Sequence, residues 1–199
     1  MIKRTRTTGK TSQPGRVRIV AGKWRSRLLD IADVPGLRPT SERIRETLFN
    51  WLAPVIQGAR CLDIFAGTGA LGLEALSRGA AEVVFVEKSP VAAATLREHI
   101  AMLNVSETAV NETDASDYLR RAPLGEFDIV FLDPPFAADV HEDLCRLLVE
   151  EQVLSKNAWI YLEEDRAKPA AVIPKGWQIM KTGLAGNVRY SLVQASAQF

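Results

Sequence analysis

Residues 62–72 read Leu-Asp-Ile-Phe-Ala-Gly-Thr-Gly-Ala-Leu-Gly. The apolar beginning is typical of a buried strand, the middle of a tight turn, and the end of the first turn of a helix. Gly67, Gly69 and Gly72 have the spacing GxGxxG, in the strand–turn–helix context that this spacing requires. Glycine lets the backbone turn sharply and lets a ligand come close, and the amides that open the helix point toward that ligand. We therefore predict a ligand-binding turn here.

Two acidic residues that follow predicted strands extend this prediction. Residues 83–86 read as a second buried strand that ends in Glu87, 20 residues after Gly67. An acid at this distance commonly binds the hydroxyls of a ribose, although an ordinary surface acid is the alternative. Asp114 follows a weaker strand near 108–112 and is a second candidate.

A third acid stands in a rarer motif. Residues 127–132 read as a buried strand and run directly into Asp133-Pro134-Pro135-Phe136. This motif could be only a turn that ends the strand. Because ligands bind at the carboxyl ends of strands in parallel sheets, we expect the glycine turn, Glu87, Asp114 and Asp133 to meet in one crevice.

The order of predicted elements indicates the fold class. Strands and helices alternate, which predicts an α/β fold with a mostly parallel, seven-stranded sheet and helices on both faces. The last two strands are joined by a short glycine-containing turn and are expected to form an antiparallel hairpin at the sheet edge. The predicted elements are strands at 61–66, 82–87, 108–112, 127–132, 158–163, 177–182 and 188–194 and helices at 70–78, from 90, from 115 to 121, and at 139–151.

The chain divides into three predicted parts. Residues 1–15 read as a flexible basic tail, residues 16–57 as an extension, and residues 58–199 as the main domain. Within the extension, strands near 16–21 and 27–31 would form a small hairpin, and a helix would run from 41 to 52 with Thr40 as its N-cap.

Composition excludes several classes of protein. The chain has 199 residues, no apolar run of 18, and no apolar segment after its basic N-terminus. These features predict a cytoplasmic protein without a membrane span or secretory signal. The two cysteines, Cys61 and Cys145, are expected to be buried thiols. His99 and His141 have no ligand spacing and are expected on the surface, so no metal site is predicted.

Charge is unevenly distributed along the chain. Residues 1–45 carry a formal charge of +9 and the remainder −8, although the whole chain carries only +1. This asymmetry predicts a basic arm that binds a polyanion such as RNA, whereas a solvated tail without a partner is the alternative for residues 1–15. Trp24, among these bases, could stack on a nucleobase or anchor the core. Arg43 and Arg45 are expected to lie off the apolar face of their helix.

The motifs together resemble class I S-adenosylmethionine-dependent methyltransferases. Residues 63–69 are similar to the first motif of that family, Glu87 to its ribose acid, and Asp114-Ala115 to its adenine-contacting pair. Residues 133–136 are similar to the Asp-Pro-Pro-aromatic motif of enzymes that methylate exocyclic amines of nucleobases. The resemblance implies a cofactor site made of Asp63, Phe65, Ala66, Gly67, Thr68, Gly69, Glu87, Lys88, Asp114, Ala115 and Asp133.

Two stretches upstream of these motifs resemble a narrower family. Residues 22–28 (GKWRSRL) and 38–50 (RPTSERIRETLFN) are similar to bacterial methyltransferases that modify the N2 amine of guanine 966 in 16S ribosomal RNA. This resemblance covers residues 16–195 and implies an enzyme that acts on 16S rRNA without a metal. A small-subunit assembly particle is the expected substrate, with free rRNA as the alternative, and a monomer is the default expectation.

The resemblance implies catalytic roles for Asp133, Pro134, Pro135 and Phe136. It favours contacts with RNA or the target base for Arg38, Thr40, Arg43 and Arg45, for which helix-start chemistry and surface charge are the alternative. The cations and the ring of the predicted hairpin are also expected to contact RNA; these are Arg18, Lys23, Trp24, Arg25 and Arg27. Tyr190, on the last hairpin, could reach the crevice.

Three other functions remain open at this stage. A methyltransferase that modifies the N6 amine of adenine would use the same Asp-Pro-Pro-Phe motif. A nicotinamide-dependent dehydrogenase would use GxGxxG and Glu87, but its pyrophosphate would be repelled by Asp63, which better suits a cationic ligand. A non-catalytic RNA-binding protein would bind RNA with a steep salt dependence but transfer no methyl group. For Tyr190, packing within the fold is the alternative to a contact in the crevice.

Overall fold

The computed structural model describes residues 15–121 and 124–195, so most of the predicted tail lies outside the described residues. The strands, in chain order, are β1 Arg16–Arg18, β2 Leu28–Asp30, β3 Arg60–Asp63, β4 Glu82–Glu87, β5 Thr108–Glu112, β6 Phe127–Leu132, β7 Leu154–Asp165, β8 Gln178–Ala185 and β9 Val188–Gln194. The helices are α1 Glu42–Leu52, α2 Ala70–Ser77, α3 Pro90–Leu103, α4 Ala115–Leu119 and α5 His141–Glu150.

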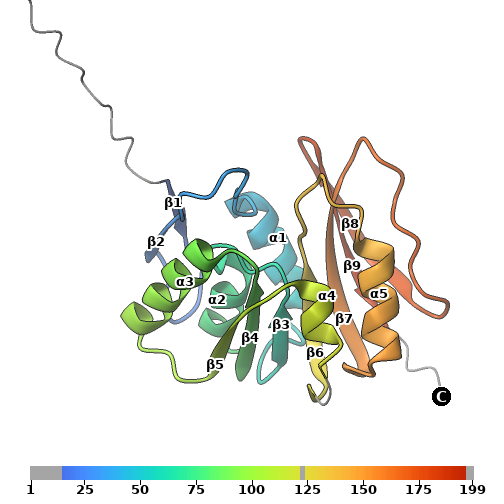
Figure 1. The fold of residues 1–199 in the computed structure, drawn as a ribbon, viewed down its shortest axis with the longest axis horizontal. Coiled ribbons are helices and arrows are strands. Elements are labelled where there is room, and N and C mark those ends of the chain that lie inside the picture. The colour runs from blue at the N-terminus through green and yellow to red at the C-terminus, as the bar shows by residue number, and fades with distance from the viewer. Residues whose placement is uncertain (1–14, 122–123, 196–199) are drawn as a thin grey trace, which may run out of the picture.

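A seven-stranded sheet forms the body of the molecule (Figure 1). Its strand order is β5-β4-β3-β6-β7-β9-β8. The first five strands in this order run parallel, while β9 pairs antiparallel with both β7 and β8. The predicted α/β class, the mostly parallel sheet and the antiparallel C-terminal hairpin are therefore confirmed.

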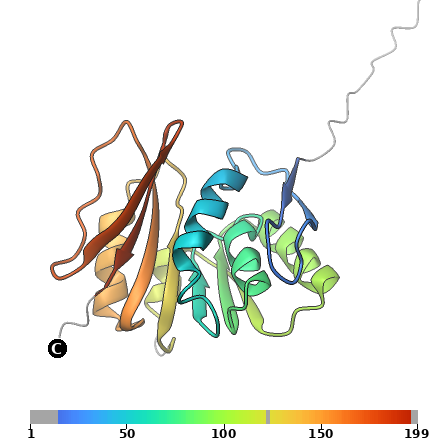
Figure 2. The same cartoon turned by 180° about the vertical axis from the view of Figure 1, so that it is seen from behind.

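Helices cover both faces of this sheet, as views from opposite sides show (Figures 1 and 2). On one face, α1, α2 and α3 pack over a core that includes Phe49, Phe85 and Phe131. On the other face, α4 and α5 pack over a second core. Side chains alternate between the two faces along each strand, so the central strands are buried on both sides. Among the described residues, no helix is long and apolar enough to cross a membrane.

The predicted N-terminal hairpin is present, but its strands are only three residues long. Val17, Ile19 and Leu29 belong to the same core as α1, α2 and α3, so the hairpin is packed onto the body. The loop between the strands is held by α2: Ser77 Oγ accepts from Trp24 N at 3.0 Å and donates to the Ala21 carbonyl at 2.6 Å.

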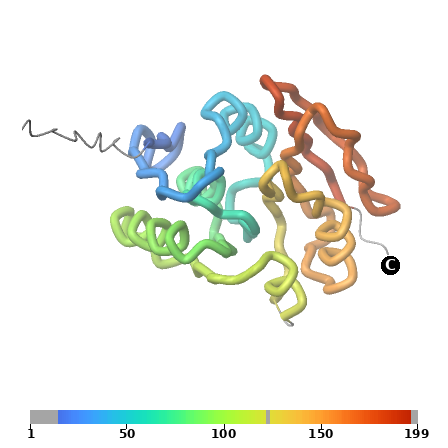
Figure 3. The backbone as a smooth tube through the Cα atoms, turned by 45° about the horizontal axis from the view of Figure 1, so that its top comes forward, coloured from blue at the N-terminus to red at the C-terminus, as the bar shows by residue number. Residues whose placement is uncertain are grey.

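The segment that joins β2 to α1 crosses over the carboxyl ends of the central strands (Figure 3). It ends at Ser41, whose hydroxyl accepts from the Ile44 amide and caps α1. The prediction of Thr40 as the N-cap is therefore wrong. Both residue types suit a cap, and the Thr40 hydroxyl instead donates to Asp133 Oδ2 at 2.9 Å.

The two histidines are buried, so their predicted surface position is wrong. His99 Nε2 accepts from the Asp30 amide at 3.1 Å and joins α3 to the hairpin. His141 Nε2 lies 2.9 Å from the Glu163 carbonyl and joins α5 to β7. Burial lowers the pKa of both imidazoles. Cys61 and Cys145 are buried free thiols, as predicted.

Candidate active site

A cavity of about 530 Å³ opens at the carboxyl ends of the parallel strands. Its volume is in the range typical of small-molecule sites. Five chain segments line it: 34–40, 63–71 without Gly69, 86–88, 113–115 and 133–137. Four of them are the segments predicted to converge, and the structure brings them together.

The glycine turn follows β3 and is fixed by two carboxylates. Gly67 has φ +51° and Gly69 has φ +79°, in the left-handed region that favours glycine. Glu87 Oε2 accepts from the Gly67 amide at 2.8 Å, and Asp63 Oδ2 accepts from the Gly72 amide at 2.9 Å. The two acids therefore shape the turn as well as facing the cavity. Gly69 stands behind it and opens α2 as the N-cap.

The third glycine of the motif serves packing. A Cβ atom at Gly72 would lie 2.2 Å from the ring of Phe85 on β4. This close approach of helix and sheet is the role expected for the last glycine of GxGxxG.

Acidic groups dominate the charge of the cavity. Burial raises the pKa of Asp63 to about 7, against the opposing effect of its hydrogen bond with the Gly72 amide, and Glu87 raises it further. Burial and the neighbouring Glu163 raise the pKa of Asp133 well above its usual range. A cationic ligand would be stabilised by these carboxylates, which fits a sulfonium and an ammonium group better than a pyrophosphate.

Lys88, Asp114 and Ala115 line the far side of the cavity. Asp114 caps α4 by accepting from the Ser116 amide at 2.9 Å and forms an ion pair with Lys88 at 3.2 Å. Partial burial raises the pKa of Asp114, but the hydrogen bond from the Ser116 amide and the Lys88 ammonium outweigh it, so this pKa lies below its usual value.

The Asp-Pro-Pro-Phe motif follows β6 and lines the opposite side. Asp133 is half-buried, and its Oδ2 atom accepts from Thr40. The backbone beyond it turns back, since the Ala138 amide donates to the Pro135 carbonyl at 2.7 Å. Phe136 presents an exposed ring, and its carbonyl accepts from Lys168 Nζ at 2.8 Å. The motif thus places a carboxylate and an aromatic ring at the mouth of one cavity.

Residues 34–39 form a roof over the glycine turn, which sequence reasoning missed except for Arg38. A Cβ atom at Gly67 would lie 2.8 Å from Leu37 Cδ1, so this leucine is packed against the turn. The signal that could have revealed the roof is the Pro-Gly-Leu-Arg-Pro sequence at 35–39, a rigid loop directly before the helix.

Of the residues expected to contact RNA, only Arg38 and Thr40 line the cavity. Trp24 is partly buried against the core, with the Lys23 ammonium 5.1 Å from its ring centre, so it acts as an anchor and keeps one edge near solvent. Among the expected RNA contacts, the exposed cations outside the cavity are Arg18, Lys23, Arg25, Arg27 and Arg43.

Two of the expected RNA contacts are not accessible. Arg45 is only 1% exposed: its guanidinium donates to the carbonyls of Thr40 and Arg18 and to Glu74 Oε2. The prediction that Arg45 faces away from the core is therefore wrong, because a buried acid on α2 compensates its charge. Tyr190 is buried and stacks on Trp51 with ring centres 5.4 Å apart, which is the packing alternative.

Comparison with known proteins identifies the family of this chain. Residues 17–194 match the family model described as conserved hypothetical protein 95. The chain is 43% identical over 187 residues, 94% of both chains, to ribosomal RNA small subunit methyltransferase D of Escherichia coli. It is 44% identical over 184 residues to the protein of that name from Haemophilus influenzae, covering 90% of this chain and 94% of the relative.

A solved structure extends the likeness to three dimensions. The putative methyltransferase yhhF from Escherichia coli superposes with a TM-score of 0.86 at 40% identity, over 92% of this chain and 100% of that one. The chain belongs to the family of ribosomal RNA small subunit methyltransferase D, which is the conserved hypothetical protein 95 family.

Proposed function

We propose that this protein transfers a methyl group from S-adenosylmethionine to the N2 amine of guanine 966 in 16S ribosomal RNA. The observation that carries the proposal is the position of Asp133-Pro134-Pro135-Phe136, on the wall of the same cavity as the glycine turn. One cavity thus holds a site for the cofactor and a site for an exocyclic amine.

The cofactor would be held by the predicted set of residues that line the cavity, with Glu87 and Asp114 toward the nucleoside and Asp63 toward the cationic end. When bound, S-adenosylmethionine supplies a methyl group activated by a sulfonium. The protein's task is then to hold the amine in line with that methyl group.

Asp133 and Pro134 activate the amine. The lone pair of an exocyclic guanine nitrogen is delocalised into the ring, so the nitrogen is a poor nucleophile. The Asp133 carboxylate would accept one N–H and the Pro134 carbonyl the other. Both acceptors are held in place beforehand, since proline fixes its own φ and Thr40 holds Asp133. Preorganised acceptors stabilise the positive charge that develops on nitrogen.

The nitrogen lone pair forms the new N–C bond, and one N–H proton must then leave. Asp133 is placed to accept this proton, and its raised pKa suits that role. Phe136 would stack on the extruded base and replace the stacking lost from the RNA.

The N-terminal extension supplies the RNA contact in this proposal. Its exposed cations would neutralise RNA phosphates, which dominate affinity for nucleic acids. We assign residues 16–57 to this extension and residues 58–199 to the methyltransferase domain, and place the enzyme in the cytoplasm as a monomer acting on a small-subunit assembly particle.

Replacing Asp133 tests the proposal. Asp133→Ala should lower kcat for methyl transfer at least a hundredfold, the loss expected for a preorganised group in the transition state. The dissociation constant for S-adenosylmethionine should change less than about threefold, because the other cavity walls remain. Asp139→Ala, which removes an exposed acid beyond the motif, is the matched control.

The product decides between the candidate functions. Labelled S-adenosylmethionine is incubated with small-subunit particles from cells lacking this protein, and modified nucleosides are identified by mass spectrometry. N2-methylguanosine at position 966 supports the proposal. N6-methyladenosine would show that the target is an adenine instead. Cofactor binding without methyl transfer would favour the non-catalytic alternative.

A further inference from the structure

Arg45 on α1 is a buried cation to which the proposed function gives no role. Its side chain is almost fully buried, so it does not reach RNA at the surface. It also lies outside the set of residues that line the cavity. Burying a charge is costly unless the charge is paired and its hydrogen bonds are satisfied. The partners of Arg45 therefore indicate what this residue does.

The two terminal nitrogens of the guanidinium attach Arg45 to α2 and to the N-terminal hairpin. Nη1 donates to Glu74 Oε2 on α2 at 3.3 Å. Nη2 donates to the Arg18 carbonyl on β1 at 2.7 Å. Because a guanidinium is planar and rigid, these two bonds also fix the position of the third nitrogen, Nε.

That third nitrogen holds the backbone of Thr40. Arg45 Nε donates to the Thr40 carbonyl at 3.2 Å. Thr40 precedes Ser41, the N-cap of α1, so the hydrogen bonds of the helix do not hold this carbonyl. The Thr40 hydroxyl donates in turn to Asp133 Oδ2 at 2.9 Å. Thr40 is thus bound through its backbone by Arg45 and through its side chain by Asp133.

The direction of the bond between Arg45 and Thr40 follows from the groups involved. A guanidinium has only donors and a backbone carbonyl only accepts, so Arg45 donates to Thr40. Both residues are buried, so water does not compete freely for this bond. A continuous series of hydrogen bonds therefore runs from α2 and β1, through Arg45 and Thr40, to Asp133.

We propose that Arg45 is a positioning residue that holds the Thr40 backbone, so that the Thr40 hydroxyl keeps the Asp133 carboxylate in its orientation toward the target amine. This inference rests on the proposed function, because Asp133 has its role in methyl transfer. Without the bond from Nε, Thr40 loses its fixed position. Asp133 then spends time in orientations that do not accept from the amine.

Two substitutions separate the Nε donor from the charge. Arg45→Lys keeps a cation for Glu74 but places a methylene group where Nε stands, so the bond to Thr40 is lost. Arg45→Gln removes the charge but places an amide nitrogen at the position of Nε, so a donor for Thr40 remains. We expect Arg45→Lys to lower kcat for methyl transfer to small-subunit particles about tenfold, the effect of one hydrogen bond in the transition state.

Arg45→Gln should keep kcat within about threefold of the wild type. KM for S-adenosylmethionine should change less than about threefold in either variant, because Arg45 lies outside the cavity. Stability should follow the opposite order: Arg45→Gln leaves the buried Glu74 with less compensating charge and should unfold at a lower temperature than Arg45→Lys. A merely structural role of Arg45 would rank kcat and stability in the same order.

A double variant tests whether Arg45 acts through Thr40. Thr40→Val removes the hydroxyl, keeps the backbone carbonyl and should lower kcat about tenfold. In the Thr40→Val background, Arg45→Lys should lower kcat less than about twofold further, because the bond to Asp133 is already absent. Independent effects would multiply to about a hundredfold. This comparison also keeps the test decisive if Arg45→Gln does not fold.

The matched control is Arg78→Lys. Arg78 on α2 donates through its own Nε atom to the same glutamate, to Glu74 Oε1 at 2.7 Å, rather than to Thr40. Lysine at this position also replaces a donor by a methylene group. Arg78→Lys should therefore lower stability but leave kcat unchanged.

Four results would overturn the inference: a wild-type kcat in Arg45→Lys, a larger loss of kcat in Arg45→Gln than in Arg45→Lys, multiplied losses in the double variant, or an equal loss of kcat in Arg78→Lys. If the wild-type protein itself transfers no methyl group to particles, the proposed function fails, and this role of Arg45 fails with it.

Discussion

Asp63 makes stability depend on pH in a direction unusual for an acid. Its pKa is about 7 in the folded protein against an ordinary value of 3.8. Between these values the folded state binds more protons than the unfolded state, so the free energy of unfolding falls as pH rises from about 4 to 7. Asp63→Asn removes the titrating group and keeps an acceptor for the Gly72 amide.

We expect Asp63→Asn to gain stability relative to the wild type as pH rises, by a few kcal/mol between pH 4 and 8, since one pKa unit corresponds to about 1.4 kcal/mol. Urea unfolding at a series of pH values measures this difference. Asp139→Asn, an exposed acid, serves as the control. If the stability of Asp63→Asn and of the wild type depended on pH in the same way, the raised pKa of Asp63 would be contradicted.

The positions of some single residues could be predicted from the sequence, and those of others could not. Glu87 and Asp133 could be placed from local spacing, because Glu87 ends and Asp133 directly follows a strand that is revealed by its own side-chain pattern. The partners of Thr40 and Arg45 could not, because they lie 93 and 29 residues away in the chain. A polar side chain on a helix is read as solvent-facing unless its distant partner is known.

At the scale of elements, Glu74 attaches the N-terminal hairpin to helix α2. This fully buried carboxylate accepts from the amides of Val20 and Ala21 at 2.7 and 3.0 Å and pairs with Arg45 and Arg78. Removing one partner from a buried ion pair typically costs about 3–5 kcal/mol, because the remaining charge is uncompensated.

Glu74→Gln should therefore destabilise the protein by about that amount and expose the hairpin loop to trypsin at Lys23 and Arg25. Thermal unfolding and limited proteolysis measure the two effects. Glu98→Gln, which alters an exposed glutamate on α3, should change neither. An unchanged cleavage rate in Glu74→Gln would show that other contacts hold the hairpin.

Element boundaries follow the same division between local and distant causes. β4, β5 and β6 have the predicted bounds. For β4 and β6 the reason is a short, mostly apolar or β-branched run between turn residues, whereas β5 has a weaker pattern. β7 begins at Leu154, four residues before the prediction, because Leu154 pairs with Phe127 across a register shift. No pattern within residues 154–157 reveals that pairing.

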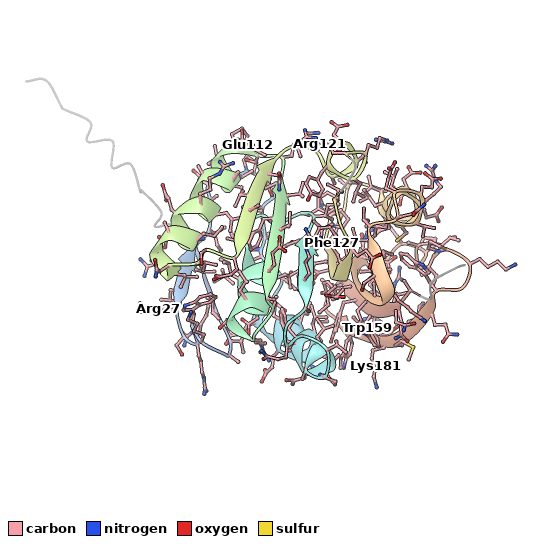
Figure 4. All side chains as sticks on the ribbon, turned by 90° about the horizontal axis from the view of Figure 1, so that it is seen from below. Arg27, Glu112, Arg121, Phe127, Trp159 and Lys181 are labelled. Carbon is pink, nitrogen blue, oxygen red and sulfur yellow. The ribbon has the colours of Figure 1, made fainter. Side chains whose placement is uncertain are left out.

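At the scale of the whole molecule, the cations of the N-terminal hairpin lie far from the C-terminal hairpin. Arg27 lies on the N-terminal hairpin and Lys181 on β8, at separate sides of the structure (Figure 4). If the N-terminal cations bind phosphates, the salt dependence of RNA affinity should respond to changes on that side only.

We expect Lys23→Ala/Arg25→Ala to weaken binding of a 16S rRNA fragment and to lower the slope of log K against log salt by about two, roughly one per phosphate contact. Lys181→Ala should leave the slope unchanged. Fluorescence anisotropy over a series of salt concentrations measures both. Equal slopes for the two variants would show that the hairpin loop does not contact RNA phosphates.

The attachment of the hairpin to α2 has a consequence for how such enzymes diversify. The amides of Val20 and Ala21 donate to the Glu74 carboxylate, and the Trp24 amide in the turn that follows donates to Ser77 Oγ. A hairpin transplanted onto a different catalytic body would meet no such acceptors and would leave its own amides unpaired. The extension is therefore not an independent module: its exposed tip is open to evolutionary change, while its base and the face of α2 that it contacts must be inherited together.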